Sequence, residues 1–311
     1  MRPLLSILLF LHHFLKVAGE TTTQNAKTSP MIVQPYGYAD KVEIQQPNNV
    51  YFSRRIEEDG IVTKKIPFES VVYYKSTEGF ASGAMPVPEE VHCLNIITRD
   101  NALFIPHLLG YSQDVQNKMH VLTMRDAPGV SLDKYLTTVI NDQLPEDAFK
   151  YILFQIVMAE LFLLNRDIAH GDLQAKNIYI NPRTLAIKVT ELGLAQHGNP
   201  MPVGPSGGLF DHIAPERCDK TAAISGEASE VFSIGVVAYR LLHRGKSPFK
   251  NESGKFTTQI EKFACVDCSE ETKKVVTSML DADPDKRIRL TKVKDSEWLA
   301  MGSNMLIDSY L

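Results

Sequence analysis

The sequence predicts an α+β chain in which a strand-rich N-terminal third precedes a helix-rich remainder. Two short segments rich in β-branched and aromatic residues, 50–52 and 60–63, are joined by a polar turn. From Pro145 onward the apolar residues recur at helical spacing. Residues 148–164 and 230–242 are long and mostly apolar, and we expect both to form buried helices.

Further elements follow in the N-terminal third. Pro86 and Pro88 precede residues 89–97, whose apolar positions have helical spacing, and proline suits the start of a helix. Residues 103–111 and 120–124 are predicted to be strands. The order of strands, one helix and more strands therefore comes before the helical remainder.

The first 19 residues have the pattern of a secretory signal peptide. A cationic start at Arg2 precedes a mostly apolar run over 4–15, and small residues follow at 17–19. This run is shorter than the roughly 20 residues that a membrane span needs. We expect a secreted chain without a transmembrane span, and a buried N-terminal helix is the alternative. Residues 20–41 are polar and aperiodic, which predicts a disordered leader.

The charge of the chain argues against a nucleic-acid partner. The 311 residues carry a formal net charge of −4, so no basic field would attract phosphate backbones. The Cys265-x-x-Cys268 spacing also occurs in zinc and redox sites, but no second pair of this kind is present.

The most informative stretch covers residues 168–177, Ile-Ala-His-Gly-Asp-Leu-Gln-Ala-Lys-Asn. It resembles the catalytic loop of protein kinases, His-Arg-Asp-Leu-x-x-x-Asn. Residues 188–195 stand where kinases carry Lys-x-x-Asp-Phe-Gly-Leu-Ala, with Glu191 at the place of the Asp. The resemblance implies that Asp172 is the catalytic base, that Asn177 and Glu191 bind the metal, and that His170 is structural.

Other landmarks of the protein kinase family occur in the same order over residues 42–300. The resemblance assigns nucleotide binding to Lys64, to its helix partner Glu90, and to Met124 and Asp126 at the hinge, and it makes Lys64 a catalytic residue as well. It assigns the Ala-Pro-Glu motif to residues 214–216, the following helix to residues 230–235 with Glu230 in place of Asp, and the closing Asp-Pro-x-x-Arg to residues 283–287. It implies a bilobal protein-kinase fold, with a β-rich N-lobe over 42–124 and a mainly helical C-lobe over 125–311. It also implies a buried ion pair between Glu216 and Arg287.

Several family features are missing. The glycine-rich loop should lie within residues 43–51, which contain no glycine, and Pro47 lacks the N–H that a phosphate would accept. Glu191 places its carboxylate about one ångström further out than Asp, and such a shift can cost on the order of 10²-fold in rate. Gly171 replaces the Arg of the catalytic loop. Gln174 replaces a catalytic Lys, for which Lys176 could substitute.

These absences, together with the signal peptide, resemble divergent secreted kinases of apicomplexan rhoptries and dense granules. That group contains both active enzymes and pseudokinases, and the missing features favour a pseudokinase with weak or absent ATP binding, which needs no cofactor. The resemblance implies that it acts by binding or scaffolding other secreted proteins, in a secretory granule, a parasitophorous vacuole or a cyst compartment. The alternative is an active atypical Ser/Thr protein kinase that uses ATP and Mg²⁺. A second alternative is a small-molecule phosphotransferase, since such enzymes share the His-Gly-Asp-Leu form of residues 170–173.

The cysteines give a last expectation. If Glu216 pairs with Arg287, the segments around Cys218 and 265–268 become neighbours, which predicts a disulfide from Cys218 to Cys265 or Cys268 in an oxidising compartment. A Cys265–Cys268 bridge is the rival. Cys93, in the helix of the other lobe, is expected to stay reduced.

Overall fold

A computed structural model of the chain describes part of its residues. These are residues 42–46, 50–54, 60–74, 86–125, 127, 129–139, 144–198, 211–218, 225–249, 251–252, 255–256 and 268–300. The signal peptide and leader predicted over 1–41, Asp126, Cys265 and the side chain of Cys218 lie outside this description.

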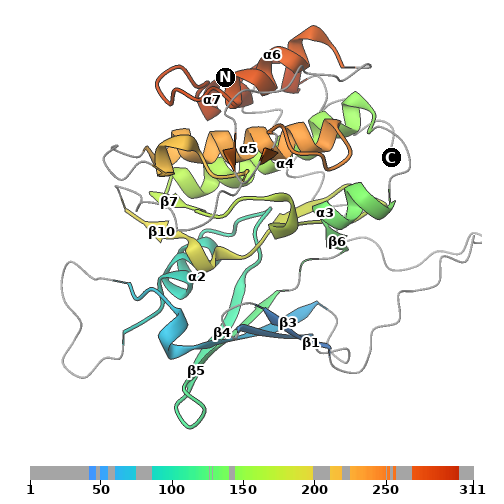
Figure 1. Ribbon diagram of the computed structural model, residues 1–311. Coiled ribbons are helices and arrows are strands. Elements are labelled where there is room, and N and C mark those ends of the chain that lie inside the picture. Colours follow the sequence, from blue (N-terminus) through green and yellow to red (C-terminus); the bar gives the residue numbers. More distant parts are fainter. Residues whose placement is uncertain are drawn as a thin grey trace, which may run out of the picture. The chain divides into compact units, whose positions relative to one another are not determined.

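A five-stranded antiparallel sheet forms the N-terminal part of the fold (Figure 1). Its strands are β1 (Val42–Gln46), β2 (Val50–Arg54), β3 (Ile61–Pro67), β4 (Leu108–Asp114) and β5 (Met119–Arg125), in the order β1-β2-β3-β5-β4. Side chains alternate between the two faces of a strand, so Lys64 and Ile66 of β3 share the buried face. The positions predicted for the glycine-rich loop fall on β1, β2 and their connection.

Strand β4 begins later than the sequence predicts. It starts at Leu108, whereas the pattern suggested a strand over 103–111. Pro106 has no N–H to donate to a neighbouring strand. The carbonyl of Phe104 accepts instead from the N–H of Val189, 2.8 Å away in the C-terminal part.

One helix, α2 (Glu89–Arg99), lies against the sheet and agrees with the predicted helix over 89–97. It begins directly after Pro88, whose missing N–H costs nothing at a helix start. Its apolar residues Val91, Leu94 and Ile97 are buried on one face. Glu89 and Glu90 occupy the first turn, where the helix dipole favours negative charge.

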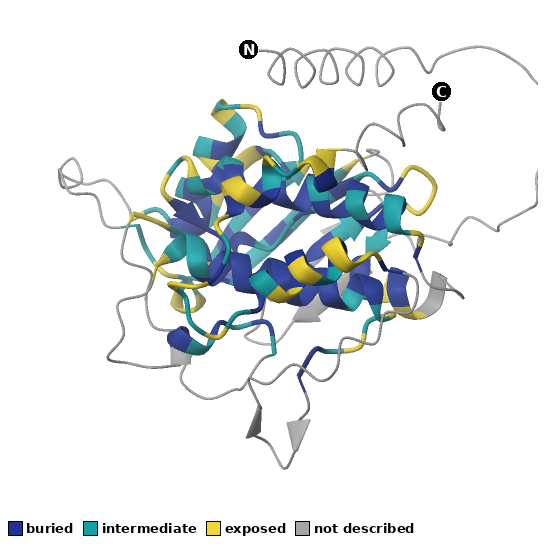
Figure 2. Ribbon diagram, turned by 90° about the horizontal axis from the view of Figure 1, so that it is seen from above, coloured by how far each residue is buried: buried dark blue, intermediate teal, exposed yellow. Residues whose placement is uncertain are grey.

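Two long helices form the core of the C-terminal part. They are α4 (Glu146–Leu164) and α5 (Gly226–Leu242), which pack side by side and are largely buried (Figure 2). Helix α5 begins at Gly226 rather than at residue 230, because the hydroxyl of Ser225 caps it by accepting from the N–H of Ala228. These helices support the loops that follow them.

The third helix of this core approaches α5 closely. At Gly235 of α5, an added Cβ would lie 2.8 Å from the Cβ of Met279, so only glycine permits this distance from α6 (Glu270–Met279). The remaining helical segments are η1 (Phe68–Ser70), α3 (Leu132–Lys134), η2 (Tyr135–Val139), η3 (Ala175–Asn177), η4 (Leu192–Leu194), η5 (Pro215–Cys218) and α7 (Leu290–Lys294).

Short strand pairs hold the two loops that resemble catalytic segments. The remaining strands of the chain's described part are β6 (Val130–Ser131), β7 (Ile168–Ala169), β8 (Ile178–Ile180), β9 (Ile187–Val189), β10 (Gln196–His197) and the separate pair β11 (Asn251–Glu252) and β12 (Lys255–Phe256). Residues 170–177 connect β7 to β8, and residues 190–195 connect β9 to β10. Because β7 pairs with β10 and β8 with β9, the two loops lie next to each other. The predicted α+β arrangement of a β-rich and a helical part is confirmed.

Two cysteines can be followed. Cys93 of α2 is free and buried, and burial, followed by the charges of Glu89 and Glu90, raises the pKa of its thiol to about 12. Cys268 is disulfide-bonded, but its partner lies outside the described side chains, so the pairing stays a prediction. Among the described residues we find no helix whose length and hydropathy would suit a membrane span.

Candidate active site

A buried ion pair joins the sheet to helix α2. The Nζ of Lys64 lies 2.7 Å from Oε1 of Glu90, and both residues are at most 5% exposed. A second carboxylate, that of Glu191, places its Oε2 3.3 Å from the same Nζ, and its side chain is 35% exposed. The predicted Lys64–Glu90 contact is therefore present. Lys64 also contacts Glu191, which belongs to the loop after β9.

The electrostatics of this cluster hold Lys64 in its charged form. Burial alone lowers the pKa of Lys64, but the charges of Glu90 and Glu191 and their hydrogen bonds outweigh it, so the pKa is raised above its usual value. One ammonium then faces two carboxylates. This cluster has an excess of negative charge on its exposed side, where a cation would be stabilised.

Glu89 and Glu90 are neighbours in sequence but have different partners. Successive residues of a helix point about 100° apart. The side chain of Glu89 accepts a hydrogen bond from the backbone N–H of His197, with 2.8 Å between the two atoms. Glu90 is left to meet Lys64, as the sequence predicts.

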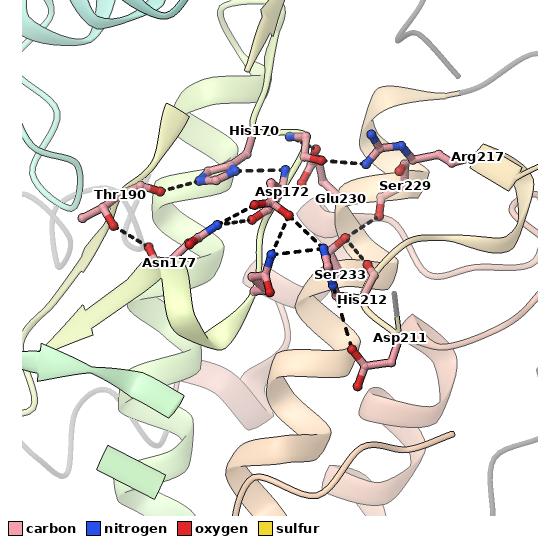
Figure 3. A network of polar contacts seen from close by, with 12 residues as sticks. His170, Asp172, Asn177, Thr190, Asp211, His212, Arg217, Ser229, Glu230 and Ser233 are labelled. Atoms are coloured by element: carbon pink, nitrogen blue, oxygen red, sulfur yellow. Dashed lines mark hydrogen bonds and ion pairs between the residues drawn. The ribbon is translucent and has the colours of Figure 1, made fainter. Parts of the chain in front are cut away.

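The loop between β7 and β8 presents the carboxylate of Asp172, which is 23% exposed (Figure 3). Its Oδ1 accepts from Nε2 of Gln174 at 2.5 Å and faces Nε2 of His212 at 2.9 Å. Its Oδ2 accepts from Nδ2 of Asn177 at 2.8 Å. Asn177 also donates to the backbone carbonyl of Asp172, so the two residues of the predicted motif fix each other.

His212 and Asp172 shift each other's ionisation. Burial alone raises the pKa of Asp172, but the hydrogen bond and charge of His212 lower it below its usual value. Burial likewise works against the imidazolium of His212, and the bonds to Asp172 and Asp211 outweigh this and raise the pKa of His212. Both shifts favour an ion pair.

Buried polar groups hold the catalytic-type loop in place (Figure 3). The ring Nε2 of His170 lies 2.9 Å from the carbonyl of Thr190, which ties this loop to the loop of Glu191. The N–H of Gly171 donates to Oε1 of Glu230 at 2.8 Å, and the carbonyl of Gly171 accepts from Arg217 at 2.9 Å. Of the residues assigned a structural role, His170 thus joins this loop to the next one, and Glu230 contacts the loop directly.

Gly171 cannot be replaced by the Arg that kinases carry at this position. Its φ is +79°, and an added Cβ would lie 2.4 Å from the carbonyl oxygen of Leu194. Both conditions exclude a side chain without backbone movement. Arg217, from the segment after the Ala-Pro-Glu motif, instead supplies a buried guanidinium beside this loop.

The loop after β9 aims the carboxylate of Glu191. This residue has φ +64°, a left-handed conformation that is uncommon for a side chain as large as Glu. The carboxylate of Glu191 and the amide oxygen of Asn177, whose nitrogen is bound to Asp172, are ligand atoms that Mg²⁺ accepts. Within the described part of the chain no three His, Cys, Asp or Glu side chains form a metal cluster, so phosphate oxygens and water would complete the shell.

A second buried ion pair lies away from this cluster. Both terminal nitrogens of Arg287 contact the carboxylate of Glu216, at 2.6 and 3.0 Å. The guanidinium also donates to the backbone carbonyls of Asp281 and Ala228. The expected Glu216–Arg287 pair is present and joins the Ala-Pro-Glu segment to the end of the domain.

Two of the assigned residues that the structure describes remain without a defined role. Lys176 is exposed, and within the described residues it makes no contact with Asp172, so its catalytic role stays a prediction. Met124 lies half-buried on β5 opposite Val62 of β3. Sequence reasoning missed His212. Its position two residues before Ala214 was the available signal, but spacing alone does not reveal its contact with Asp172.

Comparisons with known proteins identify the family. Residues 57–299 match the model of the protein kinase domain. The chain is 23% identical to the serine/threonine-protein kinase Nek8 of Danio rerio over 77% of its length, and 24% identical to Aurora kinase A-A of Xenopus laevis over 83%. It spans 33% and 60% of the length of these two relatives.

A solved structure agrees with the fold. The kinase PK-1 of Cydia pomonella granulovirus is similar with a TM-score of 0.65 and 18% identity, covering 83% of this chain and 92% of the viral one. The family match extends across both the sheet and the helical part, and it includes the Lys64–Glu90 pair and the loop of Asp172. The chain belongs to the protein kinase domain family.

Proposed function

We propose that the protein is an active, atypical protein kinase that transfers the γ-phosphate of ATP to a Ser or Thr hydroxyl of another protein. The observation that carries this proposal is the buried contact of 2.7 Å between Lys64 and Glu90. In kinases this ion pair must be in place for phosphoryl transfer. It supports catalysis over the pseudokinase that the sequence alone favours.

The described residues supply the other parts of the reaction. Asp172 can accept the proton of the substrate hydroxyl, because its carboxylate is partly exposed and held by Asn177. Lys64 offers a buried cation for the phosphates. Asn177 and Glu191 would hold Mg²⁺, which neutralises phosphate charge when bound.

A pseudokinase is the second candidate, and two sequence features favour it. Residues 43–51 contain no glycine, so backbone N–H groups cannot cover the phosphates in the usual way. Glu191 replaces the usual metal-binding Asp. In this case Asp172 and Asn177 brace the loop, and the protein acts through binding. A small-molecule phosphotransferase has less support, since the family match includes the Ala-Pro-Glu segment.

The setting of the reaction belongs to the same proposal. The N-terminal signal pattern of residues 1–19 supports secretion, and secreted proteins would then be the substrates. The resemblance to secreted apicomplexan rhoptry and dense-granule kinases, and with it a granule, vacuole or cyst compartment, depends on the missing glycine loop and on Gly171.

A transfer assay tests the proposal. The secreted protein is incubated with labelled ATP, with and without Mg²⁺, and with a mixture of secreted proteins as acceptor. We expect Mg²⁺-dependent labelling that Asp172→Asn lowers by about 10²-fold or more. Labelling that survives Asp172→Asn would come from a contaminant. If no labelling occurs and ATP does not change the thermal stability of the protein, the pseudokinase is the remaining candidate function.

A further inference from the structure

His212 reaches the candidate base from a segment that is distant in sequence. Its Nε2 lies 2.9 Å from Oδ1 of Asp172, and its side chain is only 6% exposed. Its backbone is also held, because the hydroxyl of Ser233 in α5 donates to the carbonyl of His212 at 2.8 Å. The buried core helix therefore fixes the position of the imidazole (Figure 3).

The hydrogen bonds of Asp172 can be counted. A carboxylate has about four acceptor sites, two on each oxygen. His212 and Gln174 occupy both sites of Oδ1, and Asn177 occupies one site of Oδ2. Within the described part of the chain, one acceptor site remains, and it is on Oδ2.

We propose that His212 is a positioning residue of the catalytic centre, which fills Oδ1 of Asp172 so that Oδ2 takes the proton of the substrate hydroxyl. This inference rests on the proposed kinase function. In the reaction the hydroxyl oxygen forms a bond to the γ-phosphorus of ATP, the bond from that phosphorus to the bridging oxygen of ADP breaks, and the hydroxyl proton moves to Oδ2.

The charge of His212 also controls the base. Its Nδ1 faces Oδ1 of Asp211 at 3.9 Å, so the imidazole lies between two carboxylates. Among the described residues, His170 adds to the field at Asp172, and Arg240 lies 3.4 Å from Oδ2 of Asp211. The two carboxylates raise the pKa of His212, with burial opposing them.

This charge gives the proposal a pH signature. An imidazolium beside Asp172 makes the carboxylate a weaker base. When the pH rises through the raised pKa of His212, the imidazole loses a proton, keeps its Nε2–H bond to Oδ1, and leaves Asp172 more basic. We expect the kcat of the wild-type protein to step upward above the ordinary imidazole range, which is centred at about 6.5.

Two variants separate positioning from packing. His212→Leu fills similar space but donates nothing, and we expect kcat to fall by about 10-fold to 10²-fold with little change in KM for ATP. His212→Gln keeps an N–H donor and should recover most of this loss, but without the pH step. His243→Gln is the matched control, since His243 is half-buried at the end of α5 and contacts Tyr239 rather than Asp172.

A second measurement needs no turnover. NMR titration of the imidazole signals, with His212 assigned from its loss in His212→Gln, should give a pKa above the usual value in the wild-type protein. The isosteric Asp172→Asn should lower it. If it does not, Asp172 and His212 are not in contact and the proposal is wrong.

The kinetic and NMR measurements test different parts of the proposal. A wild-type protein that transfers no phosphate removes the proposed function and with it the positioning role, while the NMR titration still decides whether the contact exists. An active wild-type protein in which His212→Leu keeps full kcat refutes the positioning role alone. Equal losses in His212→Leu and His212→Gln, with the pH step retained in the latter, would reduce His212 to a packing residue.

Discussion

The chain contains two buried ion pairs that differ in how fully their charges are matched. Arg287 meets one carboxylate, Glu216, through both terminal nitrogens, and backbone carbonyls accept two more of its hydrogen bonds. Lys64 meets two carboxylates, Glu90 and Glu191, and the second of these is partly exposed. The first pair is closed and neutral, and the second is open and carries excess negative charge.

This difference separates a structural pair from a functional one. A closed pair whose charges are matched and in which four of the five guanidinium N–H groups donate to partners gains little from a ligand, so it fixes the position of the segments it joins. An open cluster still has charge to neutralise, and a metal ion or a rearrangement can do so. Four variants test this distinction, beginning with the largest expected effect.

Glu216→Gln should have the largest effect on stability. It leaves the guanidinium of Arg287 buried without a counter-charge, and breaking such a pair typically costs about 3–5 kcal/mol. We expect this loss in urea or thermal unfolding. Glu270→Gln is the control, because the pair from Glu270 to Lys273 is exposed and should contribute less than about 1 kcal/mol. Equal effects would show that the buried pair is not structural.

Lys64→Met should affect stability less and catalysis more. Glu90 loses its partner and stays buried, but burial raises its pKa, so it can take up a proton instead of remaining an unpaired charge. We therefore expect a cost of about 1–3 kcal/mol, and Glu191 can turn to solvent. Transfer of phosphate should fall by about 10²-fold or more, because a preorganised cation is missing in the transition state. Denaturant unfolding and the transfer assay measure the two effects. A larger stability loss than in Glu216→Gln would contradict the distinction.

Glu160 of α4 provides a third kind of carboxylate, one without a counter-charge. Neither of its oxygens has a hydrogen-bond partner within the described residues. Burial, and then the charge of Glu230, raise the pKa of Glu160 in the folded protein above its value in the unfolded chain. Below about pH 4.5 this group therefore does not lower the free energy of unfolding, and that free energy declines as the pH rises toward the raised pKa. Glu160→Met removes the group, and we expect a gain of about 1–3 kcal/mol at neutral pH.

The pH dependence makes the Glu160 experiment specific. The gain should be small near pH 4, where the carboxyl is protonated in both the folded and unfolded states, and larger at pH 8. Thermal unfolding at both values measures it. A variant that is less stable at both values would mean that Glu160 has a partner beyond the described residues.

Glu191→Gln should have the smallest effect on stability. Its side chain is partly exposed, and an ion pair of this kind contributes at most about 1 kcal/mol. The change removes the excess charge but keeps the shape, so ATP binding should lose its dependence on Mg²⁺. Calorimetric titration with and without Mg²⁺ checks this. An unaltered Mg²⁺ dependence would remove Glu191 from the metal site.

Much of the fold and part of the site could be predicted because the relevant signals are local. The helix starting at Glu89 follows from proline and apolar spacing, and the order of the motifs indicated the kinase fold. Asp172 and Asn177 belong to one short loop, so their contact needs little beyond their spacing. The start of β4 at Leu108 was harder to predict. The carbonyl of Phe104, shortly before it, binds the N–H of Val189, which lies far along the chain.

By itself, the sequence determined which residue types stand at each family position: a Lys on β3, a Glu at residue 191, a Gly at residue 171 and the Asp of the catalytic loop. Only the tertiary structure decided how their side chains meet. The rotation of α2 selects Glu90 rather than Glu89 for Lys64, since packing against the sheet sets that rotation. The contact of His212 with Asp172 depends on how α5 holds the intervening segment, and no spacing along the chain encodes a distance of this kind.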